Sequence, residues 1–230
     1  MNRRAEAREG LRDIAPVVVA AIPIGGLFGA LSAARGLSVA EAGLMSVLVF
    51  AGGAQFAAVE LWTYPVPVLA LAFSTLLINA RHVLMGASLT PKLEGFSWLQ
   101  RLVGFYVLTD ESWALAERRA LTQPVRPGYW FPMAMMLPPA WIGSTVLGAW
   151  LGSFLGDPAR LGADFAFTAL FIGLVAAFWR GRVTGFTIAA SGIASALTHV
   201  TAGPPWHVAA GAFAGIAAAY WAAGPDEAPA

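Results

Sequence analysis

The chain has 230 residues, of which 58% are hydrophobic and only 12% are charged, and its formal net charge is +1. Soluble domains usually carry about 25% charged residues, so this composition excludes a water-soluble globule and predicts an all-α membrane protein. The near-neutral charge argues against a nucleic-acid partner. The absence of cysteine excludes disulfides and thiolate metal sites, and the three histidines lack metal-binding spacing, so no cofactor is expected.

Membrane-spanning helices need about 20 mostly apolar residues each. Seven segments meet that requirement. An eighth, residues 99–117, is weaker because Asp110 and Glu111 lie within it, and it either spans or enters partway and turns back. In chain order the segments are 14–34, 43–63, 65–90, 99–117, 131–155, 164–180, 183–203 and 205–223. The predicted fold is a polytopic bundle of about eight (seven to eight) helices. It comprises a flank at 1–13, one transmembrane domain at 14–223 and a tail at 224–230.

The loop charges predict the orientation of this bundle. Four arginines in residues 3–12 precede the first span, and loops rich in Lys and Arg face the cytoplasm. If 99–117 spans, Arg118, Arg119 and Arg126 are cytoplasmic as well, and Lys92 lies outside. Eight helices in the cytoplasmic membrane, with both termini in the cytoplasm, fit this bias best.

Small residues predict helix breaks and close helix packing. The glycine pair in Phe50-Ala51-Gly52-Gly53 predicts a break or a close crossing, with Gln55 available for hydrogen bonding. The sequence of residues 23–26, Pro-Ile-Gly-Gly, predicts a similar interruption in the first span. Glycines at four-residue spacing, such as 25 and 29 or 148 and 152, predict close packing between helices. Shifting residues 29–58 by 119 positions along the sequence aligns Gly29 with Gly148. This match reflects either an internal repeat or chance.

An arginine lies inside the span 65–90, in the sequence Asn79-Ala80-Arg81-His82. Such a residue costs at least ~2.5 kcal/mol near the middle of a spanning helix and usually marks a functional site. Asn79 and His82 share one helix face, whereas Arg81 points about 160° away from Asn79. Arg81 either contacts a substrate or forms an ion pair with Asp110 or Glu111 that fixes the bundle.

The sequence Thr109-Asp110-Glu111-Ser112 has two interpretations. A carboxylate in a low-dielectric environment has a raised proton affinity and can carry a proton across the membrane. Alternatively, these residues begin a helix, and Thr109 or Asp110 caps its first backbone amides.

Four segments together resemble the AzlC (YgaZ-like) family, the large subunits of branched-chain amino acid exporters. They are FAGGAQF at 50–56, NARHVLMGASL at 79–89, LTDESWAL at 108–115 and DFAFTALFIGL at 164–174. The resemblance runs from about residue 12 to residue 200. It implies a multi-pass protein that works with a small AzlD-like (YgaH-like) membrane subunit and exports valine, leucine, isoleucine or related amino acids.

The favoured hypothesis is a secondary exporter in membrane lipid, because the absence of a phosphate-binding loop for ATP excludes an intrinsic ATPase. The carboxylates at 110 and 111 are the reason to expect proton antiport. Arg81, or amides at helix breaks near Gly25 and Gly52, would hold the substrate carboxylate. Asp110 or Glu111 would hold the ammonium and carry the proton. The remaining substrate-binding candidates are Asn79, His82, Gln55, Phe28, Phe56 and Met85. The alternatives are a non-transporting scaffold subunit and an intramembrane hydrolase that uses Ser191 and His199, which lie eight positions apart without a nucleophile elbow.

Overall fold

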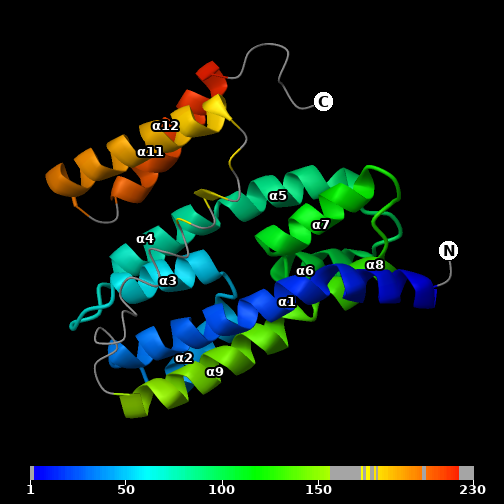
Figure 1. The fold of residues 1–230 in the computed structure, drawn as a ribbon, viewed down its shortest axis with the longest axis horizontal. Coiled ribbons are helices and arrows are strands. Elements are labelled where there is room, and N and C mark those ends of the chain that lie inside the picture. Colours follow the sequence, from blue (N-terminus) through cyan, green and yellow to red (C-terminus); the bar gives the residue numbers. More distant parts are fainter. Residues whose placement is uncertain are drawn as a thin grey trace. The chain divides into compact units, whose positions relative to one another are not determined.

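The computed structural model describes residues 3–155, 181–203 and 206–222, with single positions at 172, 175, 176 and 179. Within these residues the regular secondary structure is helical, as predicted, apart from one isolated β-bridge between Leu93 and Val125. The helices (Figure 1) are α1 (Arg3–Ala34), α2 (Val39–Leu48), α3 (Gly52–Glu60), α4 (Val68–Asn79), α5 (Arg81–Leu89), α6 (Trp98–Tyr106), α7 (Asp110–Ala120), α8 (Pro127–Ala134), α9 (Leu137–Leu155), α11 (Arg182–Thr201) and α12 (Trp206–Ala222).

Four stretches of the described residues are long and apolar enough to cross a membrane. They are Arg3–Ala34, Val68–Lys92, Pro127–Phe154 and Arg182–Thr201, and they correspond to the predicted spans 14–34, 65–90, 131–155 and 183–203. The predicted span 164–180 lies outside the described residues except for single positions. The predicted spans 43–63 and 99–117 are each broken into two short helices, so the count of eight spans is not confirmed.

The chain divides into two compact units. Unit 2 comprises Leu61–Ile78 and Asp164–Ala230, and in it α11 packs on α12 with Gly211 close to Ser195. Unit 1 comprises Met1–Glu60 and Asn79–Ala163. Unit 1 contains the candidate substrate-binding and proton-coupling residues, whereas Ser191 and His199 of the hydrolase alternative lie in unit 2.

Glycines bring α1 and α9 into backbone contact in unit 1. A Cβ atom on Gly29 would lie 2.6 Å from the backbone nitrogen of Ala149, and one on Gly148 would lie 2.7 Å from Cα of Gly26. This close packing was predicted from the glycine spacing. The predicted interruption near Pro23 is wrong, because α1 is continuous from Arg3 to Ala34. Gly25, in that segment, instead lets α1 approach Ser144 of α9.

Helices α2 and α3 form a hairpin whose outer ends lie at the C-terminal end of α1. Arg35, just before α2, pairs with Glu60 at the end of α3 at 3.4 Å. With 10 and 9 residues, the two arms are each about 15 Å long, half of a ~30 Å hydrocarbon core. A segment that returns to its starting end with arms of this length has the geometry of a re-entrant hairpin rather than a spanning helix.

Helices α6 and α7 form a second hairpin, whose outer ends lie at the N-terminal end of α1. The backbone N–H of Glu94 donates to the carbonyl of Val125 at 2.9 Å, and Lys92 pairs with Glu117. Lys92 and the end of α7 thus lie at the same end of unit 1, rather than at opposite ends as a spanning segment 99–117 requires. Residues 99–117 form two short helices that turn back, which agrees with the other course predicted for this segment.

The two hairpins enter unit 1 from opposite ends of α1 and meet at their tips (Figure 1). The hydroxyl of Tyr106, the last residue of α6, donates to the carbonyl of Val47 near the end of α2. Irregular backbone at membrane depth is tolerated only where protein or water covers it. The tip residues Phe50, Val107 and Leu108 are accordingly buried, each less than 9% exposed.

Candidate functional site

The meeting point of the hairpin tips is the candidate site. Four helix ends converge there: the ends of α2 and α6 and the beginnings of α3 and α7. Phe50 turns the chain between α2 and α3 with a positive φ of 38°. It shares one buried apolar cluster with Met85, Val107 and Leu108. The first helical bond at this end of α3 runs from the N–H of Gln55 to Ala51, so the preceding amides have no intrahelical acceptor.

Arg81 and Asp110 form an ion pair at this site. Arg81 Nη1 lies 2.6 Å from Asp110 Oδ2, and the two side chains are 40% and 39% exposed. Arg81 begins α5 and Asp110 begins α7, where the positive end of the helix dipole favours a carboxylate. The predicted ion pair is confirmed, and so is the helix start, because Thr109 and Ser112 cap α7 reciprocally. Glu111 is exposed and makes no ion pair within the described residues.

The neighbours of Arg81 have mixed roles. His82 Nδ1 lies 3.1 Å from the backbone oxygen of Asn79, so this ring is tied to its own helix. Two polar atoms remain buried without a hydrogen-bond partner, namely Asn79 Oδ1 and Arg81 Nε. Buried polar atoms are normally paired, so both atoms have unused hydrogen-bonding capacity.

A chain of buried hydrogen bonds fixes the α2–α3 hairpin to α9. Gln55 Nε2 donates to Ser46 Oγ at 2.9 Å, and Ser46 donates to Thr145 Oγ1 at 3.2 Å. Trp141 Nε1 donates to Gln55 Oε1 at 3.0 Å. Gln55, Ser46 and Thr145 are all fully buried. Both hairpin arms are thus held by specific polar contacts that an apolar environment strengthens.

Three aromatic rings pack together beside Gly52, at the beginning of α3. Phe28 stacks on Trp141 with centroids 6.2 Å apart and meets Phe56 edge-on at 5.4 Å. A Cβ on Gly52 would lie 3.2 Å from the Trp141 ring. Phe28 and Phe56 are buried against Trp141 and are thus placed to support the hairpin tip.

The candidate residues therefore form two groups in unit 1. One group lies around the ion pair and contains Asn79, Arg81, His82, Met85 and Asp110. The other lies around Trp141 and contains Gly25, Phe28, Gly52, Gln55 and Phe56. Sequence reasoning missed Trp141, Ser46, Thr145 and Tyr106, because a single sequence does not indicate which polar groups become partners.

The proposed hydrolase pair does not come together as a nucleophile and base. Ser191 packs against Gly215, with its Cβ 3.3 Å from the position of a Cβ there. The ring of His199 lies 5.2 Å from that of His207, and no hydrogen bond joins His199 to Ser191 in the described residues.

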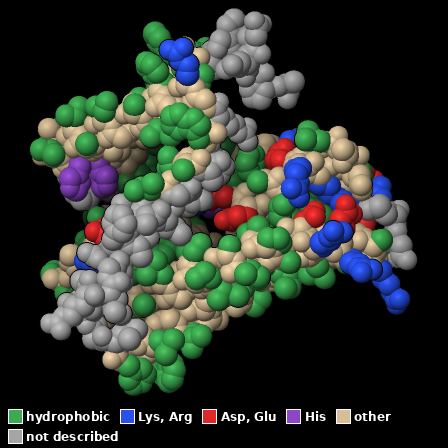
Figure 2. Space-filling view, viewed as in Figure 1, with side chains coloured by type: hydrophobic (Ala, Val, Ile, Leu, Met, Phe, Trp, Pro, Cys, Tyr) green, Lys and Arg blue, Asp and Glu red, His purple; other side chains and the backbone are tan. Residues whose placement is uncertain are grey.

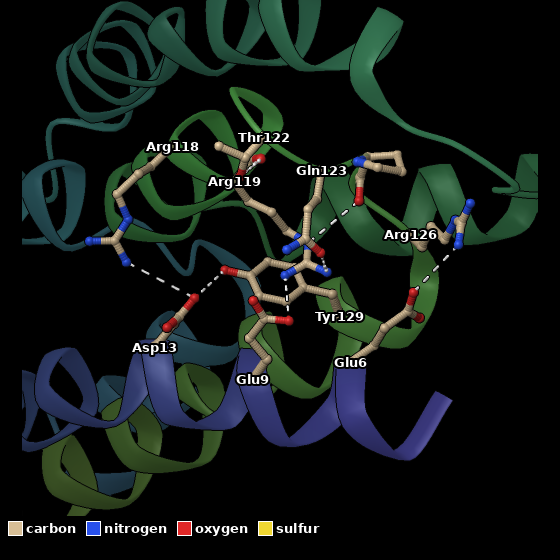
Figure 3. Close-up of polar contacts among 10 residues, drawn as sticks. Glu6, Glu9, Asp13, Arg118, Arg119, Thr122, Gln123, Arg126 and Tyr129 are labelled. Carbon is tan, nitrogen blue, oxygen red and sulfur yellow. Dashed lines mark hydrogen bonds and ion pairs between the residues drawn. The ribbon is translucent and has the colours of Figure 1, made fainter. Parts of the chain in front are cut away.

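Charged residues gather at the N-terminal end of α1. Three carboxylates of α1 face three arginines and a tyrosine contributed by α7, α8 and the loop between them (Figure 3). The ion pairs are Glu6 with Arg126 at 3.8 Å, Glu9 with Arg119 at 2.8 Å, and Asp13 with Arg118 at 4.0 Å. Figure 2 shows acidic and basic side chains around this end, beside a mainly hydrophobic face. The sequence analysis placed these arginines on the same side as the N-terminus, and the structure brings them to the same end.

Comparison with known proteins gives a consistent family match. Residues 16–155 match the family model described as AzlC protein. A relative from Archaeoglobus fulgidus, named "Uncharacterized membrane protein", is 30% identical and covers 85% of this chain and 86% of its own length. Inner membrane protein YgaZ of Escherichia coli is 29% identical, covering 95% and 93%. The branched-chain amino acid transport protein AzlC of Bacillus subtilis is 26% identical, covering 78% and 72%. No solved structure matches the chain.

Proposed function

The chain belongs to the AzlC family, and from that premise we propose that it is a secondary transporter that exports branched-chain amino acids. The similarity to a relative named as a branched-chain amino acid transport protein supports this substrate class. The observation that carries the proposal is the meeting of two hairpin tips beside the Arg81–Asp110 ion pair. Transporters commonly bind substrate near the membrane midplane, at the ends of discontinuous helices.

The ion pair suits a zwitterionic substrate. An amino acid that enters an apolar environment loses the hydration of its carboxylate and its ammonium, so each needs a partner of opposite charge. In the proposed mechanism Arg81 holds the carboxylate, assisted by the first amides of α3 near Gly52. Asp110 holds the ammonium. When the substrate leaves, the two side chains neutralise each other across 2.6 Å.

The apolar part of the site would contact the aliphatic side chain. Met85 and Phe50 belong to the buried cluster beside the hairpin tips, and the flexible methionine side chain can adapt to valine, leucine or isoleucine. Phe28 and Phe56 support the tip of the α2–α3 hairpin through Trp141. This arrangement selects for apolar side chains without requiring a rigid pocket.

Proton coupling is proposed for Asp110. The substrate ammonium and the coupling proton would both bind at Asp110, so the two would bind in alternation, as antiport requires. Glu111 is the matched control, because it adjoins Asp110 but is exposed and unpaired within the described residues. Asp110→Asn should abolish export and its pH dependence, and Glu111→Gln should change neither. Equal behaviour of the two variants would reject Asp110 as the proton carrier.

The cellular setting is also a proposal. The chain would lie in the cytoplasmic membrane beside a small AzlD-like subunit, with its N-terminus in the cytoplasm. The orientation is supported by Arg118, Arg119 and Arg126, which lie at the same end of unit 1 as the N-terminus. Such a concentration of basic residues is typical of the cytoplasmic side.

The central test is efflux from cells loaded with a valine-containing dipeptide. Cells that express the chain with the small subunit should release valine faster than cells that lack it. Arg81→Ala should abolish this difference. Arg101→Ala should preserve it, because Arg101 lies on α6 and makes no ion pair within the described residues. Unchanged efflux with and without the protein would refute export. Preserved efflux in Arg81→Ala, with failed assembly of the two subunits, would favour the scaffold alternative.

A further inference from the structure

A cavity lies in unit 1, at the N-terminal end of α1 and at the outer end of the α6–α7 hairpin. Its volume is about 490 Å³, within the range of pockets that hold small ligands. The lining residues are Arg3, Glu6, Glu94, Gly95, Gln100, Arg126, Pro127, Gly128 and Phe131. None of them belongs to the site at the hairpin tips.

Glu6 is the unusual member of this lining. The residue is only 4% exposed, and its carboxylate lies so close to Gly128 that a Cβ there would collide with Oε2. Its one charged partner is Arg126 at 3.8 Å, beyond hydrogen-bond distance, and no hydrogen bond to Glu6 occurs within the described residues. A buried carboxylate is costly unless it is paired and hydrogen-bonded. Glu6 therefore has unused capacity to accept a donor from inside the cavity.

The other charges of the cavity are arranged around this carboxylate. Arg126 is engaged by Glu94, with Nη2 2.9 Å from Oε1. Arg3 lies on the first turn of α1 and has no ion pair within the described residues. The cavity thus offers one carboxylate that lacks a donor and one guanidinium that lacks an acceptor. Phe131 adds an apolar wall.

We propose that this cavity binds the zwitterionic head of a free α-amino acid, separately from the site at the hairpin tips. Glu6 accepts hydrogen bonds from the ammonium, Arg3 donates to the carboxylate, and Phe131 contacts an apolar side chain. Two arginines and two glutamates line the cavity, so it carries no net charge and favours a ligand that is itself neutral overall. In the proposed exporter the cavity would serve as an entry site, because an exporter collects its substrate at the cytoplasmic end. This role rests on the proposed function.

The same chemistry occurs in the phosphatidylethanolamine headgroup, which carries a primary ammonium and a phosphate. The cavity holds two carboxylates as well as two arginines, and Glu94 already engages Arg126. A phosphate would therefore meet only one unpaired guanidinium beside two acidic groups. These groups suit the small carboxylate of an amino acid better, so the amino acid is the ligand we assign.

Equilibrium binding of radiolabelled valine to purified protein tests this assignment. The protein is placed in nanodiscs of phosphatidylcholine and phosphatidylglycerol, and every variant carries Arg81→Ala to remove the site at the hairpin tips. We expect valine binding to persist in this background. Adding Glu6→Gln should weaken it about tenfold or more, as expected for the loss of a charge-assisted hydrogen bond. N-acetylvaline and valinamide, which lack the ammonium and the carboxylate charge respectively, should fail to compete.

Glu9→Gln is the matched control, because it removes an ion pair one turn along α1 without lining the cavity. It should leave valine binding within about twofold of the Arg81→Ala parent. Arg3→Gln, at an exposed position on the first turn of α1, should weaken binding as Glu6→Gln does. It carries the test if Glu6→Gln fails to fold. Equal binding in the Glu6, Arg3 and Glu9 variants would overturn the proposal, as would the absence of binding in the Arg81→Ala parent.

A parallel measurement in nanodiscs that contain phosphatidylethanolamine separates the two sources of the zwitterion. Valine binding should be unchanged in these nanodiscs. If the lipid instead abolished the part of valine binding that depends on Glu6, the cavity would be assigned to the lipid and the amino-acid assignment would be overturned. Valine efflux reports on export independently of these binding measurements. Binding through Glu6 without any efflux would retain the cavity site and reject the transporter, whereas efflux without such binding would do the reverse.

Discussion

The crossing of α1 and α9 allows a quantitative prediction for Gly29→Ala. The added Cβ would lie 2.6 Å from the backbone nitrogen of Ala149, closer than the 3.0 Å that real Cβ atoms observe. The carbonyl oxygen of Thr145 lies closer still, and all the obstructing atoms are backbone. No side-chain rotation can therefore relieve the clash, and the two helices must separate locally. Overpacking of this kind costs ~1–3 kcal/mol. We expect the upper half of that range.

Gly143→Ala is the matched control on α9, because a Cβ there would meet nothing within 4 Å. Both substitutions replace a helical glycine, so the gain in helix propensity is the same and cancels in the comparison. The free energy of unfolding, measured in bicelles by steric trapping, should differ between the variants by the clash alone. A difference below about 0.5 kcal/mol would refute the claim that backbone contact holds α1 against α9. Gly29→Ala should also slow valine efflux, because the Ser46–Thr145 bond joins the α2–α3 hairpin to the same part of α9.

Three further predictions concern the site and the hairpins. Exchanging the charges, with Arg81→Asp and Asp110→Arg together, should restore thermal stability relative to either single variant but not valine efflux, because the substrate would meet reversed charges. Recovered efflux would make the pair structural only. Gln55→Leu removes the hydrogen bonds that this side chain makes with Ser46 and Trp141 and leaves the Trp141 N–H without its acceptor. It should lower the free energy of unfolding by ~1–3 kcal/mol, and an unchanged value would mean that these bonds do not hold the hairpin. Cysteines at Lys92 and Gln123, introduced into this cysteine-free chain, should react with a membrane-impermeant maleimide from the same side, and labelling from opposite sides would restore a spanning helix at 99–117.

The sequence was most informative where an unfavourable residue required a partner. Arg81 lies in an apolar run, and two adjacent acidic residues, Asp110 and Glu111, lie in another apolar segment, so an ion pair between these segments was predictable. The choice of Asp110 over Glu111 was not, because adjacent helical residues face different directions and only the packing decides which one meets α5. The helix break near Gly52 was likewise predictable from two consecutive glycines.

The α2–α3 hairpin was not predicted from hydropathy. An apolar segment such as 43–63 gives the same signal whether it crosses the bilayer or returns, because both courses bury its side chains in a nonpolar environment. A local signal does exist in the capping boxes. Ser38 with Glu41 begins α2, and Ser97 with Gln100 begins α6. Such caps mark a helix start at 39 and at 98. Whether the chain then turns back to form a hairpin depends on contacts between residues that are distant in sequence.

The likeness of the two hairpins has a consequence for the direction of movement. They begin with the same type of capping box, 59 positions apart, have arms of similar length, and enter from opposite ends. If the two hairpins open with similar energies, the proposed carrier would populate its inward-facing and outward-facing forms to a similar extent. Substrate could then reach the protein from either side of the membrane. In the proposed antiport the sign of net flux would be set by the gradients of substrate and proton together.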